Sequence, residues 1–114
     1  MSILLPIRIY PETLRSLAAA SIIGTYSAIG AAFLHPIRVF MLQNLTDEDV
    51  LFSFDGTNDH MILPSNGFIL VDVTSNSAIS QGFFVAKGTV IYAKQSGVPT
   101  TGSVYLTAFY GKDE

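Results

Sequence analysis

Charged residues are scarce in this sequence. Six Lys and Arg and nine Asp and Glu make up 13% of its 114 residues, about half the share of an ordinary soluble domain. Hydrophobic types reach 49%, and the mean hydropathy is +0.44. A single domain of this length buries only about two-thirds of the surface that its unfolded chain exposes. Composition therefore predicts that other protein subunits cover part of the apolar surface, and it points to no particular reaction.

Cysteine and tryptophan are absent. The lack of cysteine excludes disulfide bonds, thiol catalysis and cysteine-based zinc sites, and it is compatible with a reducing compartment. The net charge of −3 argues against nucleic-acid binding, because phosphate contacts need clustered Lys and Arg. The basic residues are instead scattered along the chain: Arg8, Arg15, Arg38, Lys87, Lys94 and Lys112. We expect no direct contact with DNA or RNA.

Residues 16–34 carry no formal charge. The length of this stretch approaches the roughly 20 apolar residues of a spanning helix, but Ser, Thr, Tyr and Gly dilute it. We therefore expect no membrane span, and a small membrane-associated protein remains an alternative. Residues 1–5 lack the basic start of a signal peptide, so none is expected.

The remaining pattern predicts strands. Val50, Phe52 and Phe54 alternate with Leu51, Ser53 and Asp55, as in a strand with one buried face. Asp55-Gly56 then supplies a turn at positive φ. Residues 37–43 are apolar on both sides apart from Arg38, as in a central strand. Further strands are expected at 68–73, 83–86, 89–93 and 104–110, between segments rich in Gly, Ser, Asn and Pro. The sequence therefore predicts an all-β fold, an antiparallel β-sandwich or jelly roll with an extended apolar N-terminal arm.

The N-terminal region differs from the rest. Residues 3–10 suggest an extended arm, residues 11–20 a short helix or loop, and residues 22–29 a strand. We assign residues 1–20 to the arm and residues 21–114 to the β-sandwich domain. Apolar groups occur on both faces of the arm, so it is either a first strand of the same core or an extension onto a neighbouring subunit.

The last predicted strand also carries large side chains on both faces. Tyr105, Thr107 and Phe109 share one face without charge. This composition resembles a protein interface, although the arm of the same chain is an alternative cover. The predicted interface residues are Ile3, Leu4, Leu5, Ile7, Ile9, Tyr105 and Phe109.

Candidates for catalysis are few. Residues 55–59 offer side-chain oxygens to calcium but lack the length and the distal Glu of an EF-hand loop, so we interpret them as a solvated turn. His35 and His60 are 25 positions apart and form no metal-ligand spacing. No nucleophile elbow, phosphate loop or glycine fingerprint occurs. We expect no enzymatic activity, no metal and no cofactor.

A resemblance to a known family rests on the pattern of strand and turn residues along the sequence. It is carried by His35-Pro36-Ile37-Arg38-Val39-Phe40-Met41-Leu42-Gln43-Asn44-Leu45-Thr46-Asp47, Ser53-Phe54-Asp55-Gly56, Thr89-Val90-Ile91-Tyr92-Ala93-Lys94 and Gly102-Ser103-Val104-Tyr105-Leu106-Thr107. Over residues 22–111 the sequence resembles the small β-sandwich virion proteins of tailed bacteriophages. Such proteins form rings at the portal, neck or tail, or decorate capsids, and have no enzymatic activity.

The resemblance implies a structural subunit repeated by symmetry. The expected function is a ring at the head–tail interface or tail, and a capsid decoration protein is the alternative within the same class. A carbohydrate- or receptor-binding module is an alternative from a different class, and it is suggested by the loop of residues 55–60 rather than by the resemblance. The implied partners are further copies of the chain and portal, adaptor, tail or capsid proteins. The implied location is the virion, assembled in the host cytoplasm.

Overall fold

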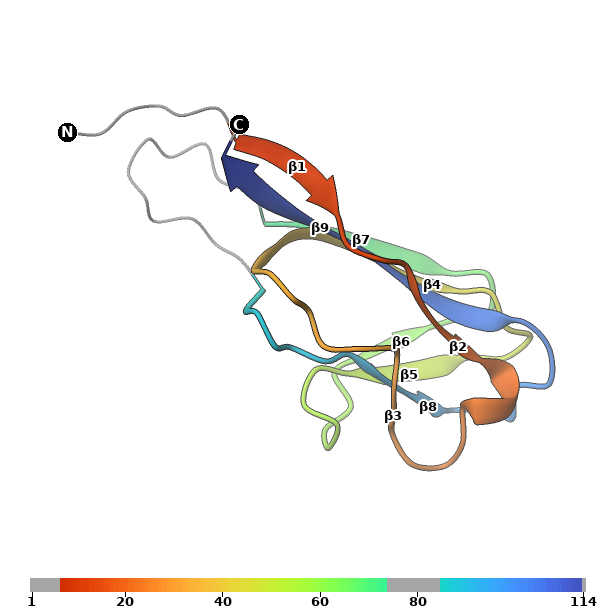
Figure 1. The fold of residues 1–114 in the computed structure, drawn as a ribbon. Helices are drawn as coiled ribbons and strands as arrows, with labels where there is room; N and C mark the ends of the chain where they lie inside the picture. Colours follow the sequence, from red (N-terminus) through yellow and green to blue (C-terminus); the bar gives the residue numbers. More distant parts are fainter. Residues whose placement is uncertain (1–6, 74–84, 114) are drawn as a thin grey trace.

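A computed structural model describes residues 7–73 and 85–113. Within these ranges the chain forms nine strands and one short 3-10 turn (Figure 1). In chain order they are β1 (Ile7–Pro11), β2 (Arg15–Ala18), η1 (Ala19–Ser21), β3 (Ser27–Ala28), β4 (Ile37–Asn44), β5 (Val50–Ser53), β6 (Met61–Leu63), β7 (Phe68–Asp72), β8 (Tyr92–Gln95) and β9 (Ser103–Asp113).

The strands form two antiparallel sheets, which confirms the predicted all-β sandwich. The larger sheet has the order β1-β9-β4-β7, and β2 also pairs with β9. The smaller sheet has the order β3-β8-β5-β6. The long strand β9 is the organising element, because β1 pairs with its last five residues and β2 with its first four. The N-terminal segment and the C-terminal strand therefore belong to one sheet.

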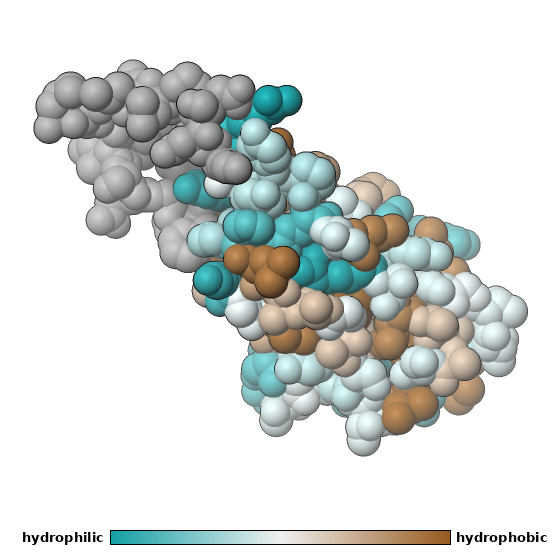
Figure 2. All heavy atoms as spheres, viewed as in Figure 1, coloured by the Kyte–Doolittle hydropathy of each residue, from teal (hydrophilic) through white to brown (hydrophobic). Residues whose placement is uncertain are grey.

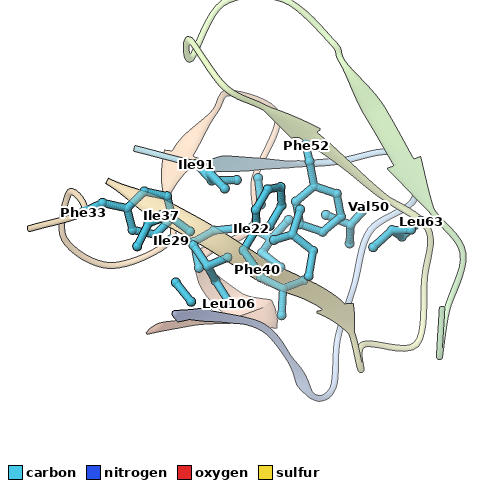
Figure 3. Packing of buried hydrophobic residues seen from close by; sticks show 14 residues of the cluster. Ile22, Ile29, Phe33, Ile37, Phe40, Val50, Phe52, Leu63, Ile91 and Leu106 are labelled. Carbon is cyan, nitrogen blue, oxygen red and sulfur yellow. The ribbon is translucent and has the colours of Figure 1, made fainter. Parts of the chain in front are cut away.

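The core lies between the two sheets (Figure 3). Alternate residues of β4 and β9 point inward, among them Phe40, Leu42 and Leu106, and meet Val50 and Phe52 of β5. Loop residues complete the core: Ile22, Ile29 and Phe33 are each at most 2% exposed. Each such buried side chain stabilises the fold by about 1.5–3 kcal/mol.

Two expected elements in the N-terminal region were only partly right. In residues 11–20 a loop and the start of η1 are present as expected, but residues 15–18 form strand β2, because they pair with β9. Residues 22–29 form only the two-residue strand β3, because Ile22 and Ile29 point into the core from irregular backbone.

Two further predictions were displaced or incomplete, and one strand was missed. The strand expected at 89–93 lies at Tyr92–Gln95, and the short strand β6 had no prediction. Half of the strand expected at 83–86 lies outside the described residues, and Val85 makes an isolated bridge to Ile37.

Two glycines are required by the backbone. Gly56 follows β5 at φ 80°, as the predicted Asp55-Gly56 turn needs. Gly102 precedes β9 at φ 83°, and a Cβ there would lie 2.0 Å from the carbonyl oxygen of Leu45. The approach of β9 to the loop after β4 therefore depends on glycine.

Candidate functional site

Residues 39–43, 68–72 and 105–109 of the larger sheet present an almost uncharged surface on the side that faces away from the core. Strand pairing places nine side chains on it in three rows, and we call these nine the outer face. The rows are Asp72, Val39 and Phe109; Leu70, Met41 and Thr107; and Phe68, Gln43 and Tyr105. Asp72 is the single charged residue, at one end. The outer face is thus a flat, apolar surface with a few neutral polar groups.

Solvent reaches much of this surface. Phe68 is 65% exposed and Leu70 is 59% exposed, while the other apolar members are partly buried by their neighbours. Tyr105 and Phe109 share the face, as predicted from the sequence. The described part of the N-terminal arm pairs beside β9, with Ser16 opposite Tyr105 and Pro11 opposite Phe109. The interpretation that this arm lies over the two aromatic rings is therefore wrong for residues 7–18.

The other predicted interface residues lie in or before β1. Ile7 is opposite Asp113, and Ile9 is opposite Gly111, two residues beyond Phe109 on β9. Ile9 therefore lies on the same side of the sheet as the outer face, and it is 51% exposed. Ile3, Leu4 and Leu5 lie outside the described residues. The structure thus brings Ile9, Phe109 and Tyr105 to one side of one sheet.

A buried ionic cluster holds the loop before β4. The Glu12 side chain is 2% exposed, and its Oε1 accepts a 2.7 Å hydrogen bond from Arg15 Nη2. The guanidinium of Arg15 also donates to the carbonyl oxygens of Thr13, Ala31 and Ala32 and lies over the ring of Phe33. One arginine therefore satisfies four acceptors from two segments of the chain.

Glu12 has two further partners in the same loop. Its Oε2 lies 2.8 Å from His35 Nδ1, and the backbone N–H of Leu34 donates to the carboxylate. Burial alone would raise the pKa of Glu12, but the hydrogen bonds from His35, Arg15 and Leu34 outweigh it and lower the pKa. The His35 ring stacks on Tyr110 at 3.6 Å between centroids and 9° between planes. Glu12 is therefore held as a carboxylate that ties β1 and β2 to the loop.

A pocket of about 500 Å³ opens above this cluster. Glu12, Arg15 and His35 line it together with the apolar side chains of Leu14 and Leu34. Leu14 is 56% exposed and Leu34 is 68% exposed. On the face drawn in Figure 2, hydrophobic groups likewise reach the surface on both sides of a hydrophilic band. The pocket combines an internally bonded polar floor with apolar walls, and we call it the Leu34 pocket.

The acidic loop after β5 is a self-bonded turn. Asp55 Oδ1 accepts hydrogen bonds from the backbone N–H groups of Thr57 and Asn58, and these bonds keep its pKa far below the usual range. Tyr26 reaches this loop and donates to Asp59. The Lys94 ammonium covers the Tyr26 ring at 4.8 Å. The ring is therefore not a free platform for a sugar.

Neither a metal site nor a membrane span is formed by the part of the chain that the structure describes. Within residues 7–73 and 85–113, no three side chains of the metal-ligating types come together. None of the helices in these same ranges has the length and apolarity needed to cross a membrane.

The buried cluster around Glu12 was missed in the sequence analysis. The sequence shows His35 only as a histidine without metal-ligand spacing, and Arg15 only as one of the scattered basic residues. One signal was present: Glu12 and Arg15 immediately precede the uncharged stretch of residues 16–34, and His35 immediately follows it. Charges that flank an apolar stretch on both sides are candidates for pairing with each other across it.

Comparison of the chain with protein-family models, with curated proteins and with solved structures found no match.

Proposed function

We propose that the protein is a non-enzymatic structural subunit that assembles with copies of itself through the outer face. One observation carries the proposal: the outer face presents nine side chains with a single charge at its edge. The water-facing side of a sheet normally carries polar side chains. Interface cores are instead depleted of charge and enriched in aromatic residues and Met. Phe68, Tyr105, Phe109 and Met41 fit the second description.

The size of the outer face supports a multipoint contact. With strands about 4.8 Å apart and a side-chain repeat of about 6.8 Å, nine positions cover about 300 Å². A standard interface buries about 800 Å² per partner. Assembly therefore needs a second contact besides the outer face, as occurs when each subunit of a ring touches two neighbours.

For the biological setting we propose the virion of a tailed bacteriophage, with a ring at the head–tail interface or tail, on the strength of the resemblance described above. A capsid decoration protein is the alternative within the same class. Native mass spectrometry separates the two, because a ring subunit gives one closed copy number. Mass spectrometry of purified particles tests whether the chain is a virion component.

The outer face itself is tested by Leu70→Lys. Leu70 is the end residue of the middle row and is 59% exposed, so a charge there leaves the free energy of unfolding within about 0.5 kcal/mol. We expect the wild-type chain to sediment as an oligomer, and the variant to need at least about tenfold more protein to associate, a loss of about 1.4 kcal/mol.

Val98→Lys is the matched control, since Val98 is 67% exposed and lies outside the outer face. We expect it to associate as the wild type does. A wild-type chain that stays monomeric at high concentration, or equal association of the two variants, contradicts the proposal.

A further inference from the structure

We propose that the Leu34 pocket binds a small, uncharged and mostly apolar molecule that carries a hydrogen-bond donor, and that His35 Nε2 accepts its hydrogen bond. Small-molecule sites are usually concave and mostly apolar, with a few convergent polar groups and volumes of about 300–1,000 Å³. The Leu34 pocket, at about 500 Å³, is within this range. It shares no residue with the outer face, so the inference goes beyond the assembly proposal and is tested independently of it.

The walls of the pocket favour a ligand with an apolar body. Leu14 is 56% exposed and Leu34 is 68% exposed, and Ala31 and Ala32 also line the pocket. A ligand that covers these side chains removes apolar surface from water, which stabilises the complex.

The two charges of the ionic cluster already have partners. The Glu12 carboxylate accepts hydrogen bonds from the Arg15 guanidinium, from His35 Nδ1 and from a backbone N–H. The guanidinium donates three more bonds to backbone carbonyl oxygens. A charged ligand would have to displace these bonds, so the pocket favours an uncharged one.

His35 supplies an oriented acceptor. Its Nδ1 lies 2.8 Å from Glu12 Oε2. A carboxylate only accepts hydrogen bonds, so Nδ1 carries the proton and the neutral ring keeps a lone pair on Nε2. Nε2 has no hydrogen-bond partner in the described part of the chain, and the side chain is 42% exposed. Because the ring also stacks on Tyr110, this lone pair is held in one orientation.

Two hydroxyl groups complete the polar lining, those of Thr13 and Ser16. A hydroxyl can donate or accept, so neither residue selects one kind of ligand group. The Nε2 lone pair therefore decides the class of ligand: an apolar molecule with an O–H or N–H donor.

Indole is the probe, because it is apolar, uncharged and carries one N–H donor. The chain contains no tryptophan, so indole fluorescence excited where tyrosine does not absorb has no protein background. At about pH 8, where imidazole in water is neutral, we expect a saturable shift of the emission to shorter wavelength. Benzofuran has the same shape with an oxygen in place of the N–H. We expect it to displace indole only at about tenfold higher concentration, because it leaves Nε2 without a donor.

Leu34→Gln tests the apolar wall. The position is exposed, so the fold should tolerate the change, and we expect at least about fivefold weaker binding of indole. Val98→Gln is the matched control, since Val98 is 67% exposed and lies outside the pocket. We expect it to bind indole as the wild type does.

His35→Phe tests the acceptor. It keeps a ring that can stack on Tyr110 but has no lone pair to offer, so we expect the preference for indole over benzofuran to disappear. A general loosening of the pocket would instead weaken the binding of both molecules and leave the preference in place, which would overturn the role of His35. The proposal is also overturned if the wild-type chain gives no saturable shift, if it binds indole and benzofuran equally, or if Leu34→Gln and Val98→Gln bind indole equally.

Discussion

The two ends of β4 are held by polar clusters of different chemistry. At the Ile37 end, Glu12, Arg15 and His35 form an ionic cluster beside Tyr110. At the Asn44 end the cluster is neutral. The Asn44 side chain, 0% exposed, donates to the carbonyl oxygens of Glu48 and Leu63 and accepts from the N–H and hydroxyl of Thr46.

Both clusters solve the same problem by different means. Each ties an irregular loop to the end of a buried strand, where backbone groups need partners. The neutral cluster does so without placing a charge in the interior, whereas the ionic cluster holds two charges that are costly to bury unless both remain paired. The ionic end should therefore be the more sensitive to loss of one member.

Replacing Arg15 is expected to have the largest effect. Arg15→Met keeps much of the side-chain volume but leaves the Glu12 carboxylate, 2% exposed, without its cation, and leaves the carbonyl oxygens of Ala31 and Ala32 without donors. Loss of one member of a buried ion pair costs about 3–5 kcal/mol. Urea unfolding followed by circular dichroism measures the change in the free energy of unfolding.

The matched control for Arg15 is Lys94→Met. Lys94 also pairs with a carboxylate, at 3.1 Å from Asp59, and also lies over an aromatic ring, Tyr26. It is nearer to solvent, so its removal should cost at most about 1 kcal/mol. Equal losses in the two variants would show that burial does not separate the two ion pairs, and would contradict the greater sensitivity expected of the ionic end.

The neutral end should respond less. Asn44→Leu is close in volume, but it removes the donor to the Leu63 carbonyl oxygen and the acceptor for the Thr46 N–H. Each buried group left without a partner costs about 1–3 kcal/mol, so we expect a loss of about 3 kcal/mol. Asn58→Leu, which removes an exposed bond to Asp55, is the control and should cost under about 1 kcal/mol. If Asn44→Leu lowers the free energy of unfolding no more than Asn58→Leu does, the Asn44 side chain does not hold the neutral cluster together.

Much of the fold could be predicted because period-two alternation is a local property. Val50, Phe52 and the inward residues of β9 follow it, and the structure buries them. The pairing of β2 with β9 could not be predicted in this way. Its residues Arg15 to Ala18 hold a buried charge and small side chains, and the partner strand is almost 90 positions away. Non-local pairing leaves no short-range pattern.

The candidate site was predictable only in part. The alternation in β9 placed Tyr105 and Phe109 on one face, but the strands beside them, which supply Phe68, Leu70 and Met41, depend on sheet order. The ionic cluster depends on a contact between Glu12 and His35, 23 positions apart. Side chains that meet through tertiary packing carry weak signals in a single sequence, whereas side chains on one strand carry strong ones.

The smallest predicted effect concerns Asp47, next to the neutral end. Beside the Asn44 cluster, the exposed Asp47 carboxylate accepts hydrogen bonds from the Thr100 hydroxyl and from the N–H groups of Thr100 and Thr101, and these bonds lower the pKa of Asp47 to about 2 from its usual 3.8. A folded-state pKa below the unfolded one adds stability that is fully present above about pH 4 and is lost as the pH falls towards 2. Asp47→Asn should therefore lower the melting temperature slightly at pH 6 and flatten its fall between pH 4 and pH 2.

Asp49→Asn, in the same loop, is the control, because Asp49 accepts from Ser96 through its backbone carbonyl oxygen, which the substitution leaves in place. The melting temperatures of wild type and Asp47→Asn could instead fall in parallel below pH 4. In that case the Asp47 carboxylate does not stabilise the Thr100 loop, and the acid sensitivity of the chain comes from other carboxylates. Glu12 in the ionic cluster is then the first carboxylate to test.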